Sequence, residues 1–147
     1  MIDKAREHWN KVKMGWIGSI LYVIFGFILA IALNWFLGYA LNTDTPIVAV
    51  FSESMEPVMY KGDMVVVAGF PEYKVGDIVV FDVPVRRYPI IHRIYEITNS
   101  TIKTKGDNNP GPDPWTISKE DIHGKSLVRL PLIGWIKIIF TEFTSVG

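Results

Sequence analysis

Two serines, Ser52 and Ser54, are the residues of this chain whose type and spacing best suit covalent chemistry. They end the apolar run Ile47–Phe51, which is typical of a β-strand, and Pro57 prevents that run from continuing as a hydrogen-bonded strand. Side chains alternate with a period of two in an extended chain, so both hydroxyls can lie on the same side. One hydroxyl could attack a carbonyl while the other donates a hydrogen bond to the oxyanion that forms. Because Ser-x-Ser also occurs in many surface loops, other groups must complete such a site.

A serine nucleophile needs a base, and His92 is the candidate among the three histidines of the chain because it alone lies inside an apolar run. A histidine of ordinary pKa, near 6.5, is mostly neutral at pH 7 and can accept the serine proton. A carboxylate would then orient the imidazole. Asp107 and Asp113, on a loop rich in proline and glycine, are both candidates for that role. The structural alternatives are a half-buried histidine without a catalytic role and aspartates that bond their own backbone.

The composition of the chain provides few residues for other kinds of catalytic or binding site. Cysteine is absent, which excludes thiol catalysis, thiolate metal sites and disulfides. One strand histidine and scattered aspartates do not make a zinc site, so we predict no metal and no cofactor. A paired-carboxylate glycosidase built on Asp107 and Asp113 would have only Trp115 as an aromatic sugar platform. Lys+Arg 15 balances Asp+Glu 15, which indicates no nucleic-acid partner.

A membrane-spanning helix is predicted for residues 16–41. This stretch contains no charged residue, and only Ser19 and Asn34 are clearly polar. As a helix it would be roughly 39 Å long, enough to cross a hydrocarbon core of about 30 Å. Trp16 and Trp35 stand where interfacial aromatic residues are expected. The stretch is longer than the roughly 7–15 apolar residues of a secretory signal, and no small-x-small pair follows it, so we interpret it as an uncleaved anchor.

The charges before this helix predict its orientation. Residues 1–15 form a basic leader with four Lys or Arg residues against two acidic ones, which places the N-terminus in the cytoplasm. Residues 42–147 then form an extracytoplasmic domain that is nearly neutral, with 15 − 4 = 11 Lys+Arg against 15 − 2 = 13 Asp+Glu. Because Ser54 follows about a dozen residues after the membrane exit, its substrate must come within roughly 40 Å of the membrane surface.

The extracytoplasmic domain is predicted to be mainly β. Two Gly-Asp turns, at residues 62–63 and 76–77, each feed a Val-rich run, which favours neighbouring strands of one sheet. Three prolines and two glycines make residues 105–115 an irregular loop. The apolar tail 132–143 is too short to span a membrane, and a surface strand and an interfacial segment both remain open. The predicted strands are Ile47–Phe51, Met64–Ala68, Ile78–Phe81, Ile90–Ile97, Thr101–Thr104 and Ser126–Leu130, with a helical turn at Ser118–Asp121.

Four motifs come in a fixed order behind the N-terminal anchor. They are Ser52-Glu53-Ser54-Met55-Glu56-Pro57, Gly76-Asp77-Ile78-Val79-Val80-Phe81, Ile91-His92-Arg93-Ile94 and Lys105-Gly106-Asp107-Asn108-Asn109. Together they resemble type I signal peptidases, from the anchor to about Trp135. His92 stands where bacterial members carry a lysine, so the chain is similar to the archaeal and endoplasmic-reticulum branch.

The resemblance implies a compact signal-peptidase-like β catalytic domain, with Ser54 as nucleophile and His92 as general base. It implies an orienting carboxylate among Asp107 and Asp113, of which Asp113 is our choice. Ser52 matches the position whose hydroxyl can join the Ser54 backbone N–H in an oxyanion hole. We also expect Met55, together with the apolar residues Phe51, Val58 and Met59, to line a cleft for small side chains or to touch lipid.

Signal peptidases remove signal peptides from secreted and membrane precursors, so the implied partners are such precursors, membrane lipid and, as a candidate, the translocation channel. The implied location is the cell membrane, or the endoplasmic reticulum membrane in a eukaryote. Two rivals remain. A repressor-type self-cleaving peptidase would be soluble and use a lysine base. A non-catalytic membrane-anchored scaffold or adhesion module would tolerate changes at Ser54 and His92.

Overall fold

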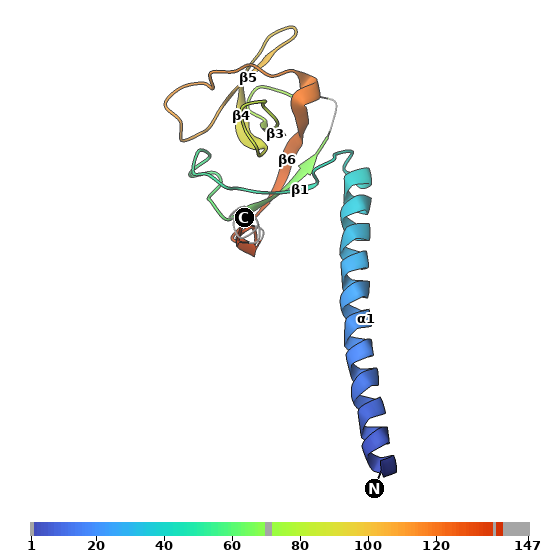
Figure 1. The fold of residues 1–147 in the computed structure, drawn as a ribbon. Coiled ribbons are helices and arrows are strands. Elements are labelled where there is room, and N and C mark those ends of the chain that lie inside the picture. Colours follow the sequence, from blue (N-terminus) through green and yellow to red (C-terminus); the bar gives the residue numbers. More distant parts are fainter. Residues whose placement is uncertain (1, 70–71, 137, 140–147) are drawn as a thin grey trace. The chain divides into compact units, whose positions relative to one another are not determined.

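The computed structural model describes residues 2–69, 72–136, 138 and 139, and the chain divides into two compact units. Met1–Leu37 is the first unit, in which the described residues are helical, whereas Gly38–Gly147 is the second and contains every strand of the described residues (Figure 1). The prediction of a mainly β domain behind an N-terminal apolar helix is therefore confirmed.

Helix α1 extends from Ile2 to Ala40, so the predicted leader is helical as well. Residues 2–14 contain neither proline nor glycine, and nothing in their sequence interrupts a helix. The part Gly15–Ala40 is long and apolar enough to cross a membrane, with a mean hydropathy of 2.4 and no buried residues in its most apolar window. Its length and composition match the segment predicted from the sequence.

Helix α1 ends in a Schellman motif. The N–H of Thr43 donates to the carbonyl of Gly38 at 3.0 Å, and the N–H of Asn42 donates to the carbonyl of Tyr39 at 3.3 Å. Asn42 has the left-handed backbone conformation that this motif requires, with φ of 49°. The helix thus stops at a defined point, and the chain passes directly into the β domain.

Six strands form one fully antiparallel sheet in the order β1-β2-β6-β3-β4-β5. Their bounds are Ile47–Ala49 (β1), Met64–Ala68 (β2), Ile78–Phe81 (β3), Ile90–Ile97 (β4), Ile102–Lys105 (β5) and Ile122–Leu130 (β6), and a 3-10 turn, η1, covers Lys119–Asp121. Strands β2, β3 and β4 have the predicted bounds, and η1 has Ser118 as its N-cap as predicted.

The predicted pairing of β2 with β3 is wrong, because β6 lies between them. Val66 of β2 pairs with Val128, and Val80 of β3 pairs with Gly124, so one long strand joins both. A Gly-Asp turn fixes where a strand begins, but it carries no information about a partner more than 40 residues away.

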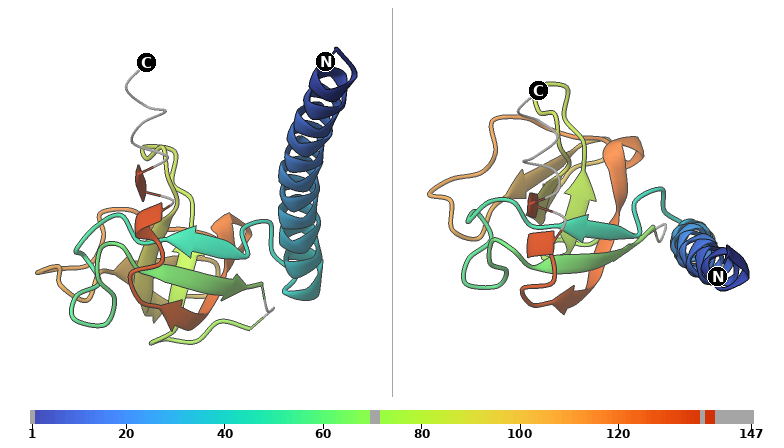
Figure 2. Two further views of the ribbon diagram at one scale, coloured as in Figure 1. Left: turned by 90° about the horizontal axis from the view of Figure 1, so that it is seen from below. Right: turned by 60° about the horizontal axis from the view of Figure 1, so that its bottom comes forward.

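The sheet is strongly curved, and this curvature builds the core. One buried cluster joins Val48 of β1 and Val65 of β2 to Val80 of β3 and Ile91 of β4. Strands β1 and β4 are four places apart in the strand order, so a flat sheet could not bring these side chains together. Figure 2 shows the strands wrapping around this interior. A second cluster joins side chains of β3, β4 and β5, among them Phe81, Ile94 and Ile102.

The tail after β6 forms no strand in the part that the structure describes. Residues 131–134 turn, and residues 135, 136, 138 and 139 are helical. Ile138 is fully buried, and the indole of Trp135 lies where a Cβ on Gly62 would clash, so this segment packs closely on the β domain. Leu132 and Ile136 remain exposed. The rest of the predicted tail, 140–143, and Lys137 lie outside the described residues.

A buried carboxylate, Asp63, ties the turn before β2 to the end of β6. Its side chain is 1% exposed, and its Oδ2 accepts a hydrogen bond from the N–H of Tyr60 at 2.7 Å. The same oxygen lies 2.6 Å from Nε of Arg129, and Oδ1 accepts from the N–H of Leu132 at 3.2 Å. Removal of this side chain would leave the half-buried guanidinium of Arg129 and the N–H groups of Tyr60 and Leu132 without this partner.

We therefore expect Asp63→Ala to lower the free energy of unfolding by about 1.5–3 kcal/mol, the usual range for the loss of hydrogen bonds to a charged group. Urea unfolding of the protein in detergent micelles, followed by tryptophan fluorescence, measures the loss. Asp44→Ala is the matched control, because Asp44 is an exposed carboxylate in the same domain and should change stability by less than about 0.5 kcal/mol. Equal losses in the two variants would contradict a structural role for the Asp63 contacts.

Candidate active site

The two serines lie in a tight turn that follows β1. Met55 and Met59 of this segment are buried in the first core cluster, and the N–H of Met59 donates to the carbonyl of Met55 at 3.0 Å. These anchors hold the turn against the sheet while Ser52 remains exposed and Ser54 is half-buried. The two hydroxyl oxygens, Ser52 Oγ and Ser54 Oγ, are 3.0 Å apart. The predicted placement of both hydroxyls on one side of the chain is therefore confirmed.

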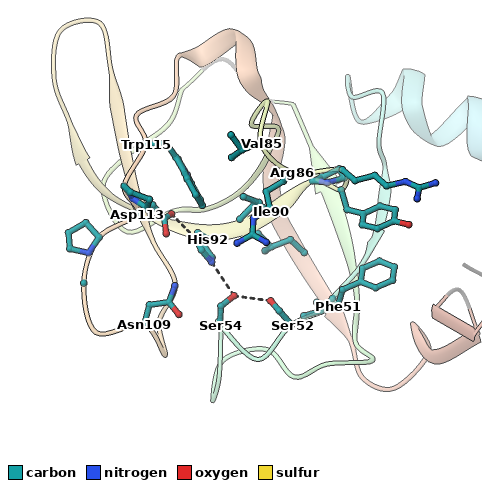
Figure 3. Close-up of a pocket in the computed structure, with 18 of the residues that line it drawn as sticks. Phe51, Ser52, Ser54, Val85, Arg86, Ile90, His92, Asn109, Asp113 and Trp115 are labelled. Carbon is teal, nitrogen blue, oxygen red and sulfur yellow. Dashed lines mark hydrogen bonds and ion pairs between the residues drawn. The ribbon is translucent and has the colours of Figure 1, made fainter. Parts of the chain in front are cut away.

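His92 points at Ser54 from strand β4. Its Nε2 lies 3.1 Å from Ser54 Oγ, as the dashed line in Figure 3 shows. The imidazole is 6% exposed, and the ring of Phe81 contacts it edge-on with the ring centroids 6.3 Å apart. Alternation along β4 places His92 on the same face as Ile94, at the border of the second core cluster. Packing on this apolar face fixes the ring and leaves one nitrogen directed at the serine.

Asp113 contacts the other nitrogen of His92. Its Oδ2 lies 2.6 Å from Nδ1 of the imidazole, and both side chains are buried. The loop after β5 folds back along that strand, so the N–H of Asp113 donates to the carbonyl of Thr104 at 2.9 Å. The hydroxyl of Thr104 also donates to Asp113 Oδ2, at 2.6 Å. Thr104 was not predicted from the sequence, although its place on the buried face of β5 is a signal that could have found it.

These contacts determine the proton positions. An ionised carboxylate can only accept hydrogen bonds, so Nδ1 of His92 carries the proton that bonds Asp113. Nε2 is then left with its lone pair facing the hydroxyl of Ser54, which can donate to it. A serine hydroxyl bonded to an imidazole, which is bonded in turn to a carboxylate, is the arrangement in which serine hydrolases transfer a proton.

The structure places the second candidate, Asp107, away from His92. Its two carboxylate oxygens accept hydrogen bonds from Nε and Nη2 of Arg93 at 2.8 and 2.6 Å. This bidentate hydrogen bond raises the pKa of the Arg93 guanidinium above its already high ordinary value, so Arg93 is charged at any physiological pH. Arg93 follows His92 on β4 and points to the opposite face, so Asp107 is bound to the strand that carries the histidine but not to the histidine.

The loop held by Asp107 also contacts the serine turn. The N–H of Asn108 donates to the carbonyl of Ser54 at 2.8 Å, and its side-chain amide donates to the carbonyl of Glu53 at 3.1 Å. A Cβ on Gly106 would lie 2.7 Å from the same Ser54 carbonyl, so only glycine permits this close approach. The loop and Arg93 together position the backbone of Ser54 relative to β4. Sequence reasoning singled out this motif but not its contact with the serines.

A cleft of about 1000 Å³ borders these groups. Phe51 lines it as predicted, together with Ser52, Ser54, His92 and Asp113. The remaining lining residues are Ala49, Val50, Val85, Arg86, Arg87, Tyr88, Pro89, Ile90, Ile91, Asn109, Pro110, Gly111, Pro112, Pro114 and Trp115.

The other apolar residues of the serine segment do not line this cleft. The side chain of Met55 is 1% exposed in the core, so it supports the serine turn from below and does not contact a substrate. Met59 is buried in the same way, and Val58 is exposed elsewhere on the surface. Among the described residues, no three His, Cys, Asp or Glu side chains gather in a way that could hold a metal ion.

Comparison with known proteins shows the family to which this chain belongs. The model of the Peptidase S24-like family matches residues 11–127. The signal peptidase complex catalytic subunit SEC11 of Komagataella phaffii is 36% identical over 124 residues, and the match covers 72% of each chain. The chain belongs to the S24-like signal peptidases. The subunit SEC11C of Homo sapiens is 38% identical over 117 residues, covering 69% of this chain and 60% of that relative. SEC11 of Colletotrichum graminicola is 33% identical over 135 residues.

The family predicted from the four motifs is thus confirmed, and the chain is a serine endopeptidase of the kind that removes signal peptides. The match to the human relative spans less than two thirds of that protein's length. The residues that the family model matches, 11–127, include Ser54, His92 and Asp113.

Proposed function

We propose that Ser54 is the nucleophile of this signal peptidase, His92 its general base and Asp113 the residue that orients His92. The contact between Ser54 Oγ and His92 Nε2, at 3.1 Å, carries the proposal. The hydroxyl attacks the carbonyl carbon of the scissile peptide bond as its proton moves to Nε2. His92 then gives that proton to the leaving amine, and the acyl group stays on Ser54. A water molecule, deprotonated by His92, attacks the ester and releases the new carboxylate.

The oxyanion is stabilised by the N–H of Ser54 and the hydroxyl of Ser52. No acceptor among the described residues takes the Ser54 N–H, so it is free to bond the developing charge. The Ser52 hydroxyl lies 3.0 Å from the attacking oxygen and can rotate toward the carbonyl oxygen of the substrate. Two donors held beside the attacking oxygen need little reorganisation during the reaction, which is the source of their effect on the rate.

The substrate is a precursor protein with an N-terminal signal peptide. The relatives that match this chain are named catalytic subunits of a signal peptidase complex. Residues 1–15 are a cytoplasmic leader, 16–41 the membrane span and 42–147 the extracytoplasmic catalytic domain, so enzyme and precursor share one membrane. Confining both to that membrane raises their effective concentration. Membrane lipid and the translocation channel are the partners that this arrangement implies.

Covalent labelling tests the assignment. Wild-type protein in detergent is treated with an organophosphonate that reacts with activated serines, and its mass is measured. We expect one adduct per chain on Ser54, because His92 accepts the proton of that hydroxyl and of no other. Ser54→Ala should take up no label, whereas Ser52→Ala, the matched control, should still be labelled on Ser54 but more slowly, because the oxyanion loses one donor.

Equal labelling of the wild type and Ser54→Ala would contradict Ser54 as the nucleophile. Absence of both labelling and precursor cleavage in a correctly folded wild type would favour the non-catalytic scaffold instead.

A further inference from the structure

Residues 85–89 of the loop 84–89 form one wall of the catalytic cleft, and residues 84–88 are exposed. The position of this loop is fixed by an aromatic contact with the segment that carries the nucleophile. The ring of Tyr88 stacks on that of Phe51 with the centroids 5.6 Å apart and the planes at 9°. The loop is also closed on itself, since the N–H of Arg86 donates to the carbonyl of Val83 at 3.0 Å. The side chains of the loop are therefore held beside the serines.

This wall carries two positive charges, and the two arginines differ in what they contact. The guanidinium of Arg87 lies over the Tyr88 ring, 5.6 Å from its centroid. Arg86 is exposed, and its guanidinium has no hydrogen-bond or ion-pair partner in the part of the chain that the structure describes. Figure 3 shows Arg86 at the border of the cleft with Ile90 and His92.

No negative charge in the described wall of the cleft offsets these arginines. Asp113 is the one carboxylate among the residues that line it, and it is buried against His92 and Thr104. Glu53, between the two serines, does not line the cleft.

We propose that Arg86 binds a carboxylate side chain of the substrate close to the scissile bond, so that this signal peptidase favours precursors with Asp or Glu there. The inference rests on the proposed function and adds a determinant of specificity. Chain segments translocated to the outer side of a membrane are poor in Lys and Arg, so a cationic wall meets few substrates that it would repel. Arginine also suits the role chemically, because its planar guanidinium can hold a carboxylate with two hydrogen bonds.

Kinetics on paired precursor peptides test the proposal. In each pair a single position within five residues of the scissile bond, on either side, is Glu in one peptide and Gln in its twin. For the wild type we expect one position at which Glu raises kcat/KM about threefold to tenfold over Gln, through a lower KM. Arg86→Gln should abolish that preference, and Arg86→Glu should reverse it, so that the Gln peptide of the pair is cleaved faster than its Glu twin. Arg87→Gln is the matched control and should retain it, and added salt should weaken it.

The outcomes separate this inference from the proposed function. Cleavage of every pair without a Glu preference would overturn the role of Arg86 and leave Ser54 catalysis intact. Failure to cleave any peptide would instead count against the proposed function itself. A loss of activity in Arg86→Gln that occurs only on vesicles containing anionic lipid, with equal rates on the paired peptides, would overturn the proposal in favour of a contact with the membrane surface.

Discussion

Ser54→Ala, His92→Gln and the double variant are expected to lower kcat by similar factors, about 10⁴ to 10⁶ each. Ser54 Oγ and His92 Nε2 act through one shared hydrogen bond, so the loss of either group ends the same step. Serine hydrolases show this non-additivity, because the second substitution removes a group that has already lost its function. Single-turnover cleavage of a precursor by each purified variant in detergent measures the three rates.

Each variant must fold for this comparison to be valid. Glutamine at position 92 keeps most of the volume beside Phe81, where alanine would leave a cavity in the second core cluster. Ser54 is half-buried and makes no contact with the core clusters, so Ser54→Ala should melt within a few degrees of the wild type. A double variant about 10⁴ times slower than either single variant would contradict a shared step and imply that the two residues act independently.

Much of the fold could be predicted from the sequence because its signals are local. Val-rich runs that follow Gly-Asp turns fixed the bounds of β2 and β3, and the apolar run around His92 fixed those of β4. The place of β6 between β2 and β3 could not be predicted in this way. Strand order depends on pairing between residues far apart in the chain, for which a single sequence has no periodic signal.

In the candidate site too, features that depend on local sequence could be predicted and those that depend on the path of a loop could not. The spacing of Ser52 and Ser54 predicts that their hydroxyls lie on one side, although a turn and not a strand brings them together, and a histidine inside an apolar strand marks His92. The choice between two aspartates depends on the path of a loop with three prolines, which no sequence pattern specifies. The loop after β5 folds back along that strand, and this path brings Asp113 to His92 while Asp107 binds Arg93. Met55 was misplaced for a related reason: its neighbour Ser54 borders the cleft, but within the turn the side chain of Met55 packs into the core.

The second large effect is expected for Asp113→Asn, which should lower kcat by about 10³- to 10⁴-fold with little loss of stability. Asparagine has the shape of aspartate but no charge, so the imidazolium that forms on His92 loses its counter-ion. If the amide group turns its NH₂ toward Nδ1, the proton of His92 must move to Nε2, which then cannot accept the proton of Ser54. The hydroxyl of Thr104 can rotate to serve either orientation. Precursor cleavage together with thermal melting in detergent measures both quantities.

Asp107→Asn is the matched control, because it makes the same chemical change on the same loop. Asp107 binds Arg93 and not His92, so this variant should lose stability, by about 1–3 kcal/mol, while kcat falls about tenfold or less. That smaller fall would come from looser contacts between Asn108 and the serine turn. The two variants therefore separate orientation of the base from positioning of the loop. Unchanged turnover in Asp113→Asn with a large loss in Asp107→Asn would assign the orienting role to Asp107, against the 2.6 Å contact of Asp113 with the imidazole.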